Sequence, residues 1–538
     1  MPYLCSCPLC SGMSDADLNA YALDAPLEAS LVRTISPAAP AVTVVSQVIS
    51  GDSRIDALLE DLSTRLNSTK APGTPVTVTY SFPALLPAAY KGDNTFGWRP
   101  FSAQQKTATK EVLNLLQQQT GITFVEVADT PAAGGVVRLS NNTQSVSAGY
   151  AYLANSSDTS LDSDVFISSP YSTNVTAGSY AWSLLVHEIG HALGLKHPGN
   201  YNAGQTTNVR EAGNYLGVNE DAFFNTIMTY RTSAQGIHNT GFMPYDLLAL
   251  RYLYGTRAFE TGGNTYTYND ASGRSVSNIV DDGGTDTLDF SAVTKAVAVD
   301  LKPGGYSSVG RLANGNIALS NLTLSLDAVI ENAVGTPQAD FMLGNAANNT
   351  FTGGSGSDTL NGAAGIDTAV FSGSFSRYAL TRIQYGMIVE DTAGSDGVDT
   401  LFDIERLRFS DKAVALDLQG HAGQVAKIIG AVFGKAALAN TALVGAGLRL
   451  LDNGMGYEEL GTVALRETGK TAPVDIVTLL WINLFKFTPS SEQIAPYVGY
   501  LGNGLSVSTL ILQAAEDSAN VANINLVGLV QTGLEYTG

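Results

Sequence analysis

The first third of the chain alternates between helical and strand patterns of hydrophobic positions. Apolar residues recur every three or four positions over 55–66 and again after Ser102, which forms a capping-box pattern with Gln105, and both stretches are predicted helices. A further long helix is predicted from Ser179 to about Leu193. Short apolar or alternating runs predict strands at 76–80, 122–127, 136–139, 149–153 and 164–167. Helices and strands mixed in this way predict an α/β pattern.

Beyond Tyr254 the chain becomes rich in Gly, Asp, Asn and Thr, and a period of nine residues appears. The period predicts a parallel β-roll, in which glycines allow tight turns, acidic groups face calcium and one apolar residue per unit faces inward. The alternative is an ordinary glycine-rich loop region. The units begin at glycines 335, 344, 353 and 362, carry Asp340, Asn349, Asp358 and Asp367 at the sixth position, and carry Met342, Phe351, Leu360 and Ala369 at the eighth.

Residues from about 420 to the end are rich in Ala and Leu and repeat at an offset of 50. Leu451–Gly454 matches Leu501–Gly504, and the segment 464–468 matches 514–518. The repeat predicts an all-α tandem module that serves stability or docking. Its most apolar stretch, 428–451, is interrupted by Lys435, Arg449 and glycines, so it predicts a buried helix pair and no transmembrane segment.

The charge balance and the cysteine positions limit the class of protein. The 538 residues include 49 acidic and 29 basic side chains, for a net charge of −20, which argues against nucleic-acid binding. The three cysteines, Cys5, Cys7 and Cys10, all lie in the first ten residues, so the rest of the chain has no disulfide. This cluster either binds or caps a metal or is chemically idle. No basic stretch followed by an apolar one opens the chain, so no Sec signal peptide is predicted.

Three of the five histidines lie within eleven residues. His187 and His191 are four residues apart, so on a helix both imidazoles reach one zinc ion from the same face. Glu188 beside them is placed to take a proton from water at the metal. Gly194 can end the helix in the left-handed conformation and bring His197 round as a third ligand. The alternative is a set of polar histidines on a helix surface.

This stretch resembles the signature HExxHxxGxxH of the metzincin endopeptidases, and its continuation into Pro198 and Gly199 resembles the serralysin family within them. The resemblance implies a methionine turn below the metal, which matches Met228. It also implies that Tyr230 ligates the resting zinc and moves to stabilise the tetrahedral intermediate. Threonines flank Met228 where the family commonly has serines, and they keep the hydroxyl groups.

The resemblance also implies structural calcium sites. Two sites are expected between the protease domain and the roll, and others within the roll itself. Glycine carbonyls and carboxylates suit the six to eight oxygen ligands of calcium. The alternative for Asp281 and Asp286 is a solvated turn. The expected ligands are Thr261, Gly263, Thr265, Asp281, Gly283, Gly284 and Asp286, with Val329 and Glu331 completing the second site, and Asp340, Gly353, Gly354, Gly356, Asp358, Gly362 and Asp367 in the roll.

The resemblance covers about residues 50–370 and implies a multidomain enzyme. The expected parts are a flexible leader or propeptide (1–50), an α+β metzincin zinc-protease domain (51–255), a calcium-binding parallel β-roll of the RTX type with flanking strands (256–419) and the helical module (420–538). The expected cofactors are one catalytic Zn²⁺ and several structural Ca²⁺. The tail departs from the usual serralysin ending, and one use for it is docking to a cell-surface component.

The function expected from these features is that of a secreted, calcium-dependent zinc endopeptidase. Its substrates would be proteins bound as an extended chain along the strand near 149–153, and its export would use type I secretion machinery. Two alternatives stay open. One is an inactive protease-like calcium-binding protein that attaches to surfaces, and the other is a zinc amidase that acts on cell-wall peptides.

Overall fold

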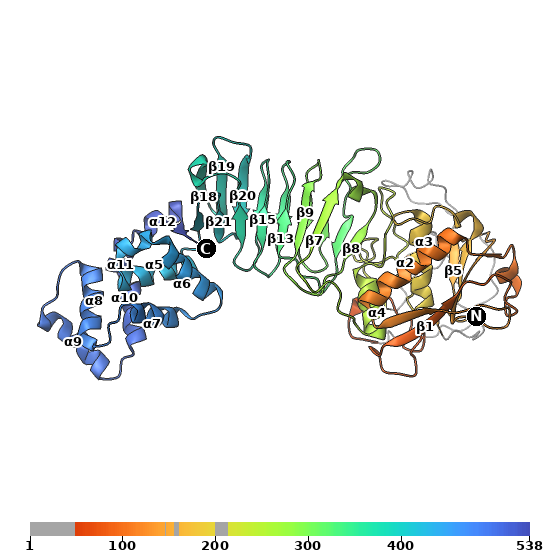
Figure 1. Ribbon diagram of the computed structural model, residues 1–538, viewed down its shortest axis with the longest axis horizontal. Coiled ribbons are helices and arrows are strands. Elements are labelled where there is room, and N and C mark those ends of the chain that lie inside the picture. The colour runs from red at the N-terminus through yellow and green to blue at the C-terminus, as the bar shows by residue number, and fades with distance from the viewer. Residues whose placement is uncertain (1–48, 146, 155–160, 200–213, 538) are drawn as a thin grey trace. The chain divides into compact units, whose positions relative to one another are not determined.

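The computed structural model describes residues 49–145, 147–154, 161–199 and 214–537 (Figure 1). The predicted leader, with Cys5, Cys7 and Cys10, lies outside these residues except at its end. The chain divides into two compact units. Unit 1 comprises Met1–Asp286 and Val299–Val329, and unit 2 comprises Thr287–Ala298 and Ile330–Gly538. The predicted domain limits at 50, 255 and 419 stay predictions.

Unit 1 contains a mixed sheet that carries five of its strands in the order β3-β1-β4-β6-β5. The pairs β1–β3, β1–β4 and β4–β6 are parallel, whereas β5 runs antiparallel to β6 at one end of the sheet. All five strands lie where the hydrophobic pattern predicted them. Their bounds are Val76–Ser81 for β1, Ile122–Glu126 for β3, Val137–Asn142 for β4, Gly149–Ala151 for β5 and Val165–Ser168 for β6, and β2 (Arg99–Pro100) pairs with β4.

The helices of unit 1 are α1 (Ser53–Asp56), α2 (Ala103–Gln119), α3 (Tyr180–Ala192) and α4 (Pro244–Tyr254). The capping box of Ser102 and Gln105 is present at the start of α2, as predicted. Ser179 caps α3, where its hydroxyl accepts a hydrogen bond from the Trp182 backbone N–H. Almost every side chain of α3 is buried, and the helix contacts β5 and β6. Helix α3, which carries His187, Glu188 and His191, is therefore packed against the edge of the sheet.

The helix predicted over 55–66 is wrong beyond Asp56. Leu58 and Leu59 are buried as the pattern required, but the backbone there makes tertiary bonds. The Leu58 carbonyl accepts a hydrogen bond from the Lys196 N–H at 2.8 Å. The Asp61 carboxylate then accepts the N–H of Ser63 at 2.6 Å, which turns the chain locally. Hydrogen bonds within the local turn and with the distant residue Lys196 therefore take the place of helical hydrogen bonds beyond Asp56.

Short strands complete unit 1. They are β7 (Thr265–Asn269), β8 (Ser277–Ile279), β11 (Tyr306–Ser307) and β12 (Leu322–Leu324), and β10 (Ala298–Asp300) spans the point where the chain passes from unit 2 back to unit 1. Strand β12 pairs in parallel with β8 and antiparallel with β11.

Unit 2 begins its regular part with strands that start every nine residues. Alternate strands pair in parallel within one of two sheets, so β13, β15 and β17 share one sheet and β14 and β16 share the other. The central residue of each strand is buried, including the four apolar residues predicted to face inward. This is the geometry of a parallel β-roll, and the glycine-rich loop alternative is wrong. The strands are Asn332–Val334, Phe341–Leu343, Thr350–Thr352, Thr359–Asn361 and Thr368–Val370.

The roll continues into a hairpin and further strands. Strands β18 and β19 form an antiparallel hairpin, after which β20 and β21 rejoin the two sheets in parallel with β16 and β17. The bounds are Thr287–Ala292 for β9, Tyr378–Ile383 for β18, Gly386–Asp391 for β19, Val398–Phe402 for β20, Arg406–Arg408 for β21, Ala413–Ala415 for β22 and Leu534–Tyr536 for β23. Because β23 pairs with β22, the helical segment is an insertion between two neighbouring strands.

The helical segment repeats its structure at the predicted offset of 50. Helices α6 and α9 both end in a turn in which a glycine of positive φ, Gly454 or Gly504, follows the helix. The next residue donates its N–H to the helix, from Met455 to Leu450 and from Leu505 to Tyr500, at 3.0 Å in both copies. The pair α5–α6 covers the predicted buried helix pair. The helices are α5 (His421–Val432), α6 (Thr441–Asp452), α7 (Tyr457–Glu467), α8 (Pro473–Phe485), α9 (Ser491–Gly502), α10 (Val507–Glu516), α11 (Ser518–Asn523) and α12 (Leu526–Thr532).

Among the described residues, the helices are all too short or too polar to cross a lipid bilayer.

Candidate active site

Three buried histidine side chains converge at the end of α3. The Nε2 atoms of His187 and His191 are 3.2 Å apart, those of His191 and His197 are 3.1 Å apart, and those of His187 and His197 are 3.3 Å apart. All three rings are nearly inaccessible to solvent. The alternative of polar surface histidines is therefore wrong.

The local sequence explains how a third histidine reaches a helix-borne pair. Helix α3 ends at Ala192, and Gly194 follows with a φ of +101°. A Cβ at this position would lie 2.4 Å from the Thr64 carbonyl oxygen, so both the backbone angle and the close approach require glycine. The chain then reverses, and the Leu195 N–H donates to the Gly190 carbonyl at 3.0 Å. This turn carries His197 back to the face of α3.

Backbone carbonyls fix the tautomers of the two helical histidines. His187 Nδ1 lies 2.8 Å from the Ile227 carbonyl oxygen, and His191 Nδ1 lies 2.7 Å from that of Leu195. A carbonyl oxygen only accepts, so each Nδ1 must carry the proton. Burial lowers the pKa of His187 to about 4 and holds the pKa values of His191 and His197 well below the usual value. The rings are therefore neutral, with the Nε2 lone pairs of His187 and His191 directed toward the centre.

This donor set fits zinc. Nitrogens bound to a tetrahedral zinc at about 2.0–2.1 Å lie about 3.3 Å from one another, close to the spacing of the three Nε2 atoms. Lone pairs that face one another at this distance repel unless a cation lies between them. The three histidines also form the one cluster of potential metal ligands found among the His, Cys, Asp and Glu side chains of the described residues. They are thus the residues that would hold the ion.

Glu188 packs against the edge strand β5. The residue is fully buried. A Cβ at Gly149 of β5 would lie 2.8 Å from Glu188 Oε1 and 2.9 Å from its Cγ. The carboxyl group therefore occupies the space that any other side chain at 149 would need. Glu188, which follows His187 in the sequence, therefore contacts the edge strand β5.

For the endopeptidase activity expected from the sequence, Gly149→Ala should lower kcat on a peptide substrate about 10- to 100-fold, because a shift of the reacting group by about 1 Å has such an effect. KM should change much less. The matched control is Gly241→Ala, since neither glycine has a positive φ and a Cβ at Gly241 meets no atom within 4 Å. Steady-state kinetics of both variants test this contact, and equal kcat values would contradict it.

The methionine turn packs directly against the helix that carries the histidines. Met228 is fully buried, and a Cβ at Gly190 would lie 2.7 Å from its Sδ. Glycine between the two helical histidines therefore allows this close approach. The preceding residue, Ile227, supplies the carbonyl that orients His187.

Asp246 of α4 holds this turn in place, and no sequence motif predicted this role. Its carboxylate accepts hydrogen bonds from the Thr226 hydroxyl at 2.5 Å and from the N–H groups of Ile227 and Met243 at 2.8 Å. Burial raises the pKa of Asp246 to about 7 against the opposing effect of these donors. Because these contacts reach back along the chain from α4 to the turn, no short motif contains them. Both threonines beside Met228 thus have defined partners, since the Thr229 hydroxyl donates to the Asp221 carboxylate.

Tyr230 lies beside the third histidine. Its ring centroid is 4.3 Å from that of His197, with the planes inclined at 58°. The residue is half-buried. The structure therefore brings His187, Glu188, His191, His197 and Tyr230 into one region of unit 1.

The first group of expected calcium ligands forms two adjacent loops in unit 1. The Asn264 N–H donates to Asp286 Oδ1 at 2.7 Å, and a Cβ at Gly284 would lie 2.3 Å from the Gly262 carbonyl oxygen. Asp281 accepts from the Tyr266 hydroxyl at 2.6 Å and from the Gly283 N–H at 2.9 Å. Both aspartates are fully buried, so the solvated-turn alternative is wrong.

The structure does not show the other expected calcium ligands of this group together in one site. Thr261, Gly263 and Thr265 lie exposed along the first of these loops. Val329 ends unit 1 and is 39% exposed, whereas Glu331 belongs to unit 2, where its carbonyl accepts the Thr350 N–H at 2.9 Å. Their shared site stays a prediction.

Carboxylates stack along one side of the roll. The Asp340 N–H donates to Asp358 Oδ1 and the Asp358 N–H donates to Asp399 Oδ1, both at 2.8 Å. Burial, and then the charges of neighbouring aspartates, raise the pKa of Asp358 to about 7 and that of Asp399 to about 8. Among the described residues, Asp358 Oδ2 is buried and has no hydrogen-bond partner. Such an oxygen fits a calcium ligand.

A second stack follows the other side of the repeat. The Asn349 N–H donates to Asp367 Oδ1 at 2.6 Å, and the Asp367 N–H donates to Glu405 Oε2 at 2.8 Å. Asp367 Oδ2 is buried and accepts no hydrogen bond from the described part of the chain. Burial raises the pKa of Asp367 to about 7.

The expected glycine ligands of the roll lie next to these carboxylates. A Cβ at Gly353 would lie 2.2 Å from Asp358 Oδ2, and one at Gly362 would lie 2.3 Å from Asp367 Oδ2. Gly354 and Gly356 have φ values of +105° and +115°. The turns therefore need glycine both for space and for conformation.

Two carboxylates of these stacks, Asp399 and Glu405, were absent from the predicted ligands. Both follow the hairpin β18–β19, which interrupts the nine-residue period. The sequence does contain a motif that indicates Asp399, because Gly397–Leu401 has the same pattern, Gly-x-Asp-Thr-Leu, as Gly356–Leu360. Glu405 has no corresponding motif.

Known families match both the region with the three histidines and the β-rich region that follows it. A family model described as metallo-peptidase family M12 matches residues 35–241, and one described as peptidase M10 serralysin C terminal matches residues 251–438. Serralysin of Proteus mirabilis is 32% identical over 52% of this chain and 61% of its own length. Serralysin C of Dickeya chrysanthemi is 31% identical over 52% and 60%, and metalloprotease AprA of Pseudomonas entomophila is 28% identical over 51% and 60%. The chain thus spans about three fifths of the length of these relatives.

Proposed function

Because the chain belongs to the serralysin family of zinc metalloproteases, as a distant homologue over about half its length, we propose that it is a calcium-dependent zinc endopeptidase. The observation that carries the proposal is the buried triangle of Nε2 atoms beside Glu188. Three neutral histidines, two of them oriented by backbone carbonyls, make the ligand set of a catalytic zinc. When bound, zinc polarises the scissile carbonyl and makes water more acidic.

The residues of the chain have separate tasks in this reaction. Glu188 takes a proton from the attacking water and returns it to the leaving amine. Tyr230, beside His197, donates its phenol hydroxyl to the oxyanion that develops on the substrate. Ile227 and Leu195 hold the tautomers of the histidines through their carbonyls. Gly194 and Met228 keep the third histidine and the turn in position.

The substrate lies along β5 in this proposal. Strand β5 ends the sheet, runs antiparallel to β6 and contacts Glu188 at Gly149. An extended peptide adds to such an edge through backbone hydrogen bonds, which suits protein substrates of varied sequence.

Calcium serves structure in the same proposal. The buried carboxylate stacks and the two loops of unit 1 support the calcium ligands expected from the sequence, with Asp399 and Glu405 added. Export through type I machinery would suit a chain whose cysteines all lie in its first ten residues and that folds where calcium is plentiful. The leader over 1–50 would act as a propeptide.

Zinc content tests the ligand set directly. We expect the purified wild-type chain to retain about one zinc ion after dialysis, and His191→Ala to lose it, because two histidines do not hold the metal. His421→Ala in the helical module is the matched control and should keep the wild-type zinc content. Metal analysis by mass spectrometry reads the result, and equal zinc in all three proteins would contradict the assignment.

A further inference from the structure

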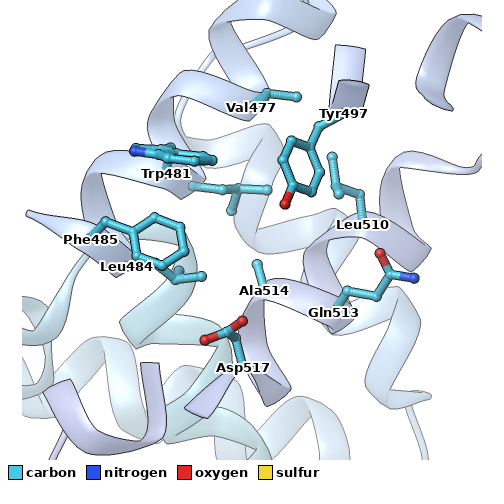
Figure 2. A pocket seen from close by; sticks show the side chains of 10 residues that line it. Val477, Trp481, Leu484, Phe485, Tyr497, Leu510, Gln513, Ala514 and Asp517 are labelled. Carbon is cyan, nitrogen blue, oxygen red and sulfur yellow. The ribbon is translucent and has the colours of Figure 1, made fainter. Parts of the chain in front are cut away.

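The helical module contains a pocket of about 230 Å³ that the protease reaction does not use. Helices α8, α9 and α10 supply its walls. Figure 2 shows Trp481 and Phe485 on one side, Tyr497 on the opposite side and Asp517 at the bottom of the view. The other apolar residues of the lining are aliphatic, namely Val477, Leu480, Leu484, Leu510 and Ala514.

The aromatic rings of the pocket form a cluster that continues onto the surface. The ring centroids of Trp481 and Phe485 are 4.6 Å apart, and those of Trp481 and Tyr497 are 6.0 Å apart. Phe487, 48% exposed, lies 6.0 Å from Trp481, and Tyr500, 55% exposed, lies 6.1 Å from Tyr497. Exposed aromatic clusters of this kind are enriched at protein interfaces.

A carboxylate gives the pocket its charge. Asp517 caps α11, where its Oδ1 accepts the Ala519 N–H at 2.8 Å, and its side chain also lines the pocket. The lining contains no Lys, Arg or His. The module as a whole, residues 420–538, has nine acidic and six basic side chains. The pocket therefore combines the negative faces of three rings with a carboxylate that no lining cation offsets.

We infer that this pocket binds the cationic side chain of a lysine or arginine on a protein partner. The apolar stem of such a side chain covers the aliphatic residues of the lining, the cation lies over the rings, and Asp517 pairs with its charge. The partner surface around it covers Phe487 and Tyr500. The module is thereby a docking domain for a basic protein surface, independent of the zinc site.

The lining residues favour a cationic side chain over other classes of ligand. A sugar ring would stack on Trp481, but its hydroxyls need several polar partners, and the lining offers only Gln513, Asp517, the Tyr497 hydroxyl and the buried Trp481 indole N–H. An anion would be repelled by Asp517. A purely apolar segment would leave the Asp517 carboxylate buried without a counter-charge.

Binding of short peptides by the full chain tests the inference. The probes are three acetylated and amidated pentapeptides, Gly-Gly-X-Gly-Gly, in which X is lysine, norleucine or glutamate, and choline serves as a small quaternary cation. The Glu188→Gln background prevents hydrolysis. We expect calorimetry to give at least a tenfold lower Kd for the lysine peptide than for the norleucine peptide, and no binding of the glutamate peptide.

Two variants place this binding in the pocket. Asp517→Asn keeps the cap of α11, since Asn caps as well as Asp, and should raise the Kd of the lysine peptide about tenfold. Trp481→Leu should have a similar effect. Glu492→Gln, an exposed acidic residue outside the lining, is the control and should leave the Kd unchanged. Equal binding of the norleucine peptide, tighter binding of choline, loss of binding in the control or no binding at all would each overturn the inference.

Discussion

Glu188→Gln is expected to lower kcat/KM on casein by about 10²–10⁴-fold, the usual contribution of a positioned general base. Glutamine has nearly the same shape, so it keeps the contact with Gly149 on β5 and the burial of the side chain. It cannot take the proton from water. The zinc ligands His187 and His191 are untouched, and the variant should therefore bind zinc as the wild type does.

The control for this experiment is Glu111→Gln, which removes an exposed carboxylate from α2. It should retain full activity. Circular dichroism and metal analysis establish that both variants are folded and loaded with zinc. Casein cleavage by a folded Glu188→Gln protein at the wild-type rate would exclude Glu188 as the base.

Removal of calcium is the second change with a large expected effect. Each of the five regularly spaced strands β13 to β17 is only three residues long and buries one central side chain, so little else offsets the repulsion within the stacks of Asp340, Asp358 and Asp399. At a calcium concentration 100 times Kd, each site adds about 2.7 kcal/mol to the free energy of unfolding. Chelation should therefore lower Tm and the β content of the far-ultraviolet circular dichroism spectrum.

Asp358→Ala should reproduce part of this loss even in saturating calcium. The control is Asp475→Asn in the helical module, an exposed aspartate in the first turn of α8 whose neutralisation should lower Tm much less. Identical melting curves with calcium and with chelator would contradict calcium binding by the roll.

The pH dependence of the calcium-free protein has a defined sign. Burial and neighbouring carboxylates raise the pKa of Asp358 and Asp367 to about 7 and that of Asp399 to about 8. The folded chain then holds more protons than the unfolded one between about pH 4 and 8, so the free energy of unfolding falls as the pH rises through this window. With calcium bound the carboxylates are ionised, and stability should instead rise with pH. Denaturation at several pH values with chelator tests this, and a rise in stability toward pH 8 would contradict it.

Local patterns predicted those parts of the fold whose signals lie within a few consecutive residues. The nine-residue repeat has a glycine, an acidic group and an inward residue in every unit, and its strands start at Asn332, Phe341, Thr350, Thr359 and Thr368 as the period requires. The capping residues Ser102 and Ser179 likewise marked helix starts within their own turns.

Contacts between distant segments could not be predicted in this way. Asp246 supports the methionine turn from another helix, and Gly149 meets Glu188 across the fold. The helical spacing over 55–66 marked the buried residues correctly, but the pairing of Leu58 with Lys196 decided the backbone conformation. The same hydrophobic pattern fits both a helix and an irregular segment that is buried on one side.

Mapping the products of a denatured protein substrate by mass spectrometry tests directly whether the chain is an endopeptidase. The zinc-loaded wild-type chain should create new N-termini at internal peptide bonds of casein, lose this activity with a zinc chelator and regain it with added zinc. Peptidoglycan should stay intact. Release of cell-wall peptides without cleavage of casein would indicate the amidase, and no cleavage of either by a folded, zinc-loaded chain would indicate an inactive surface-attachment protein.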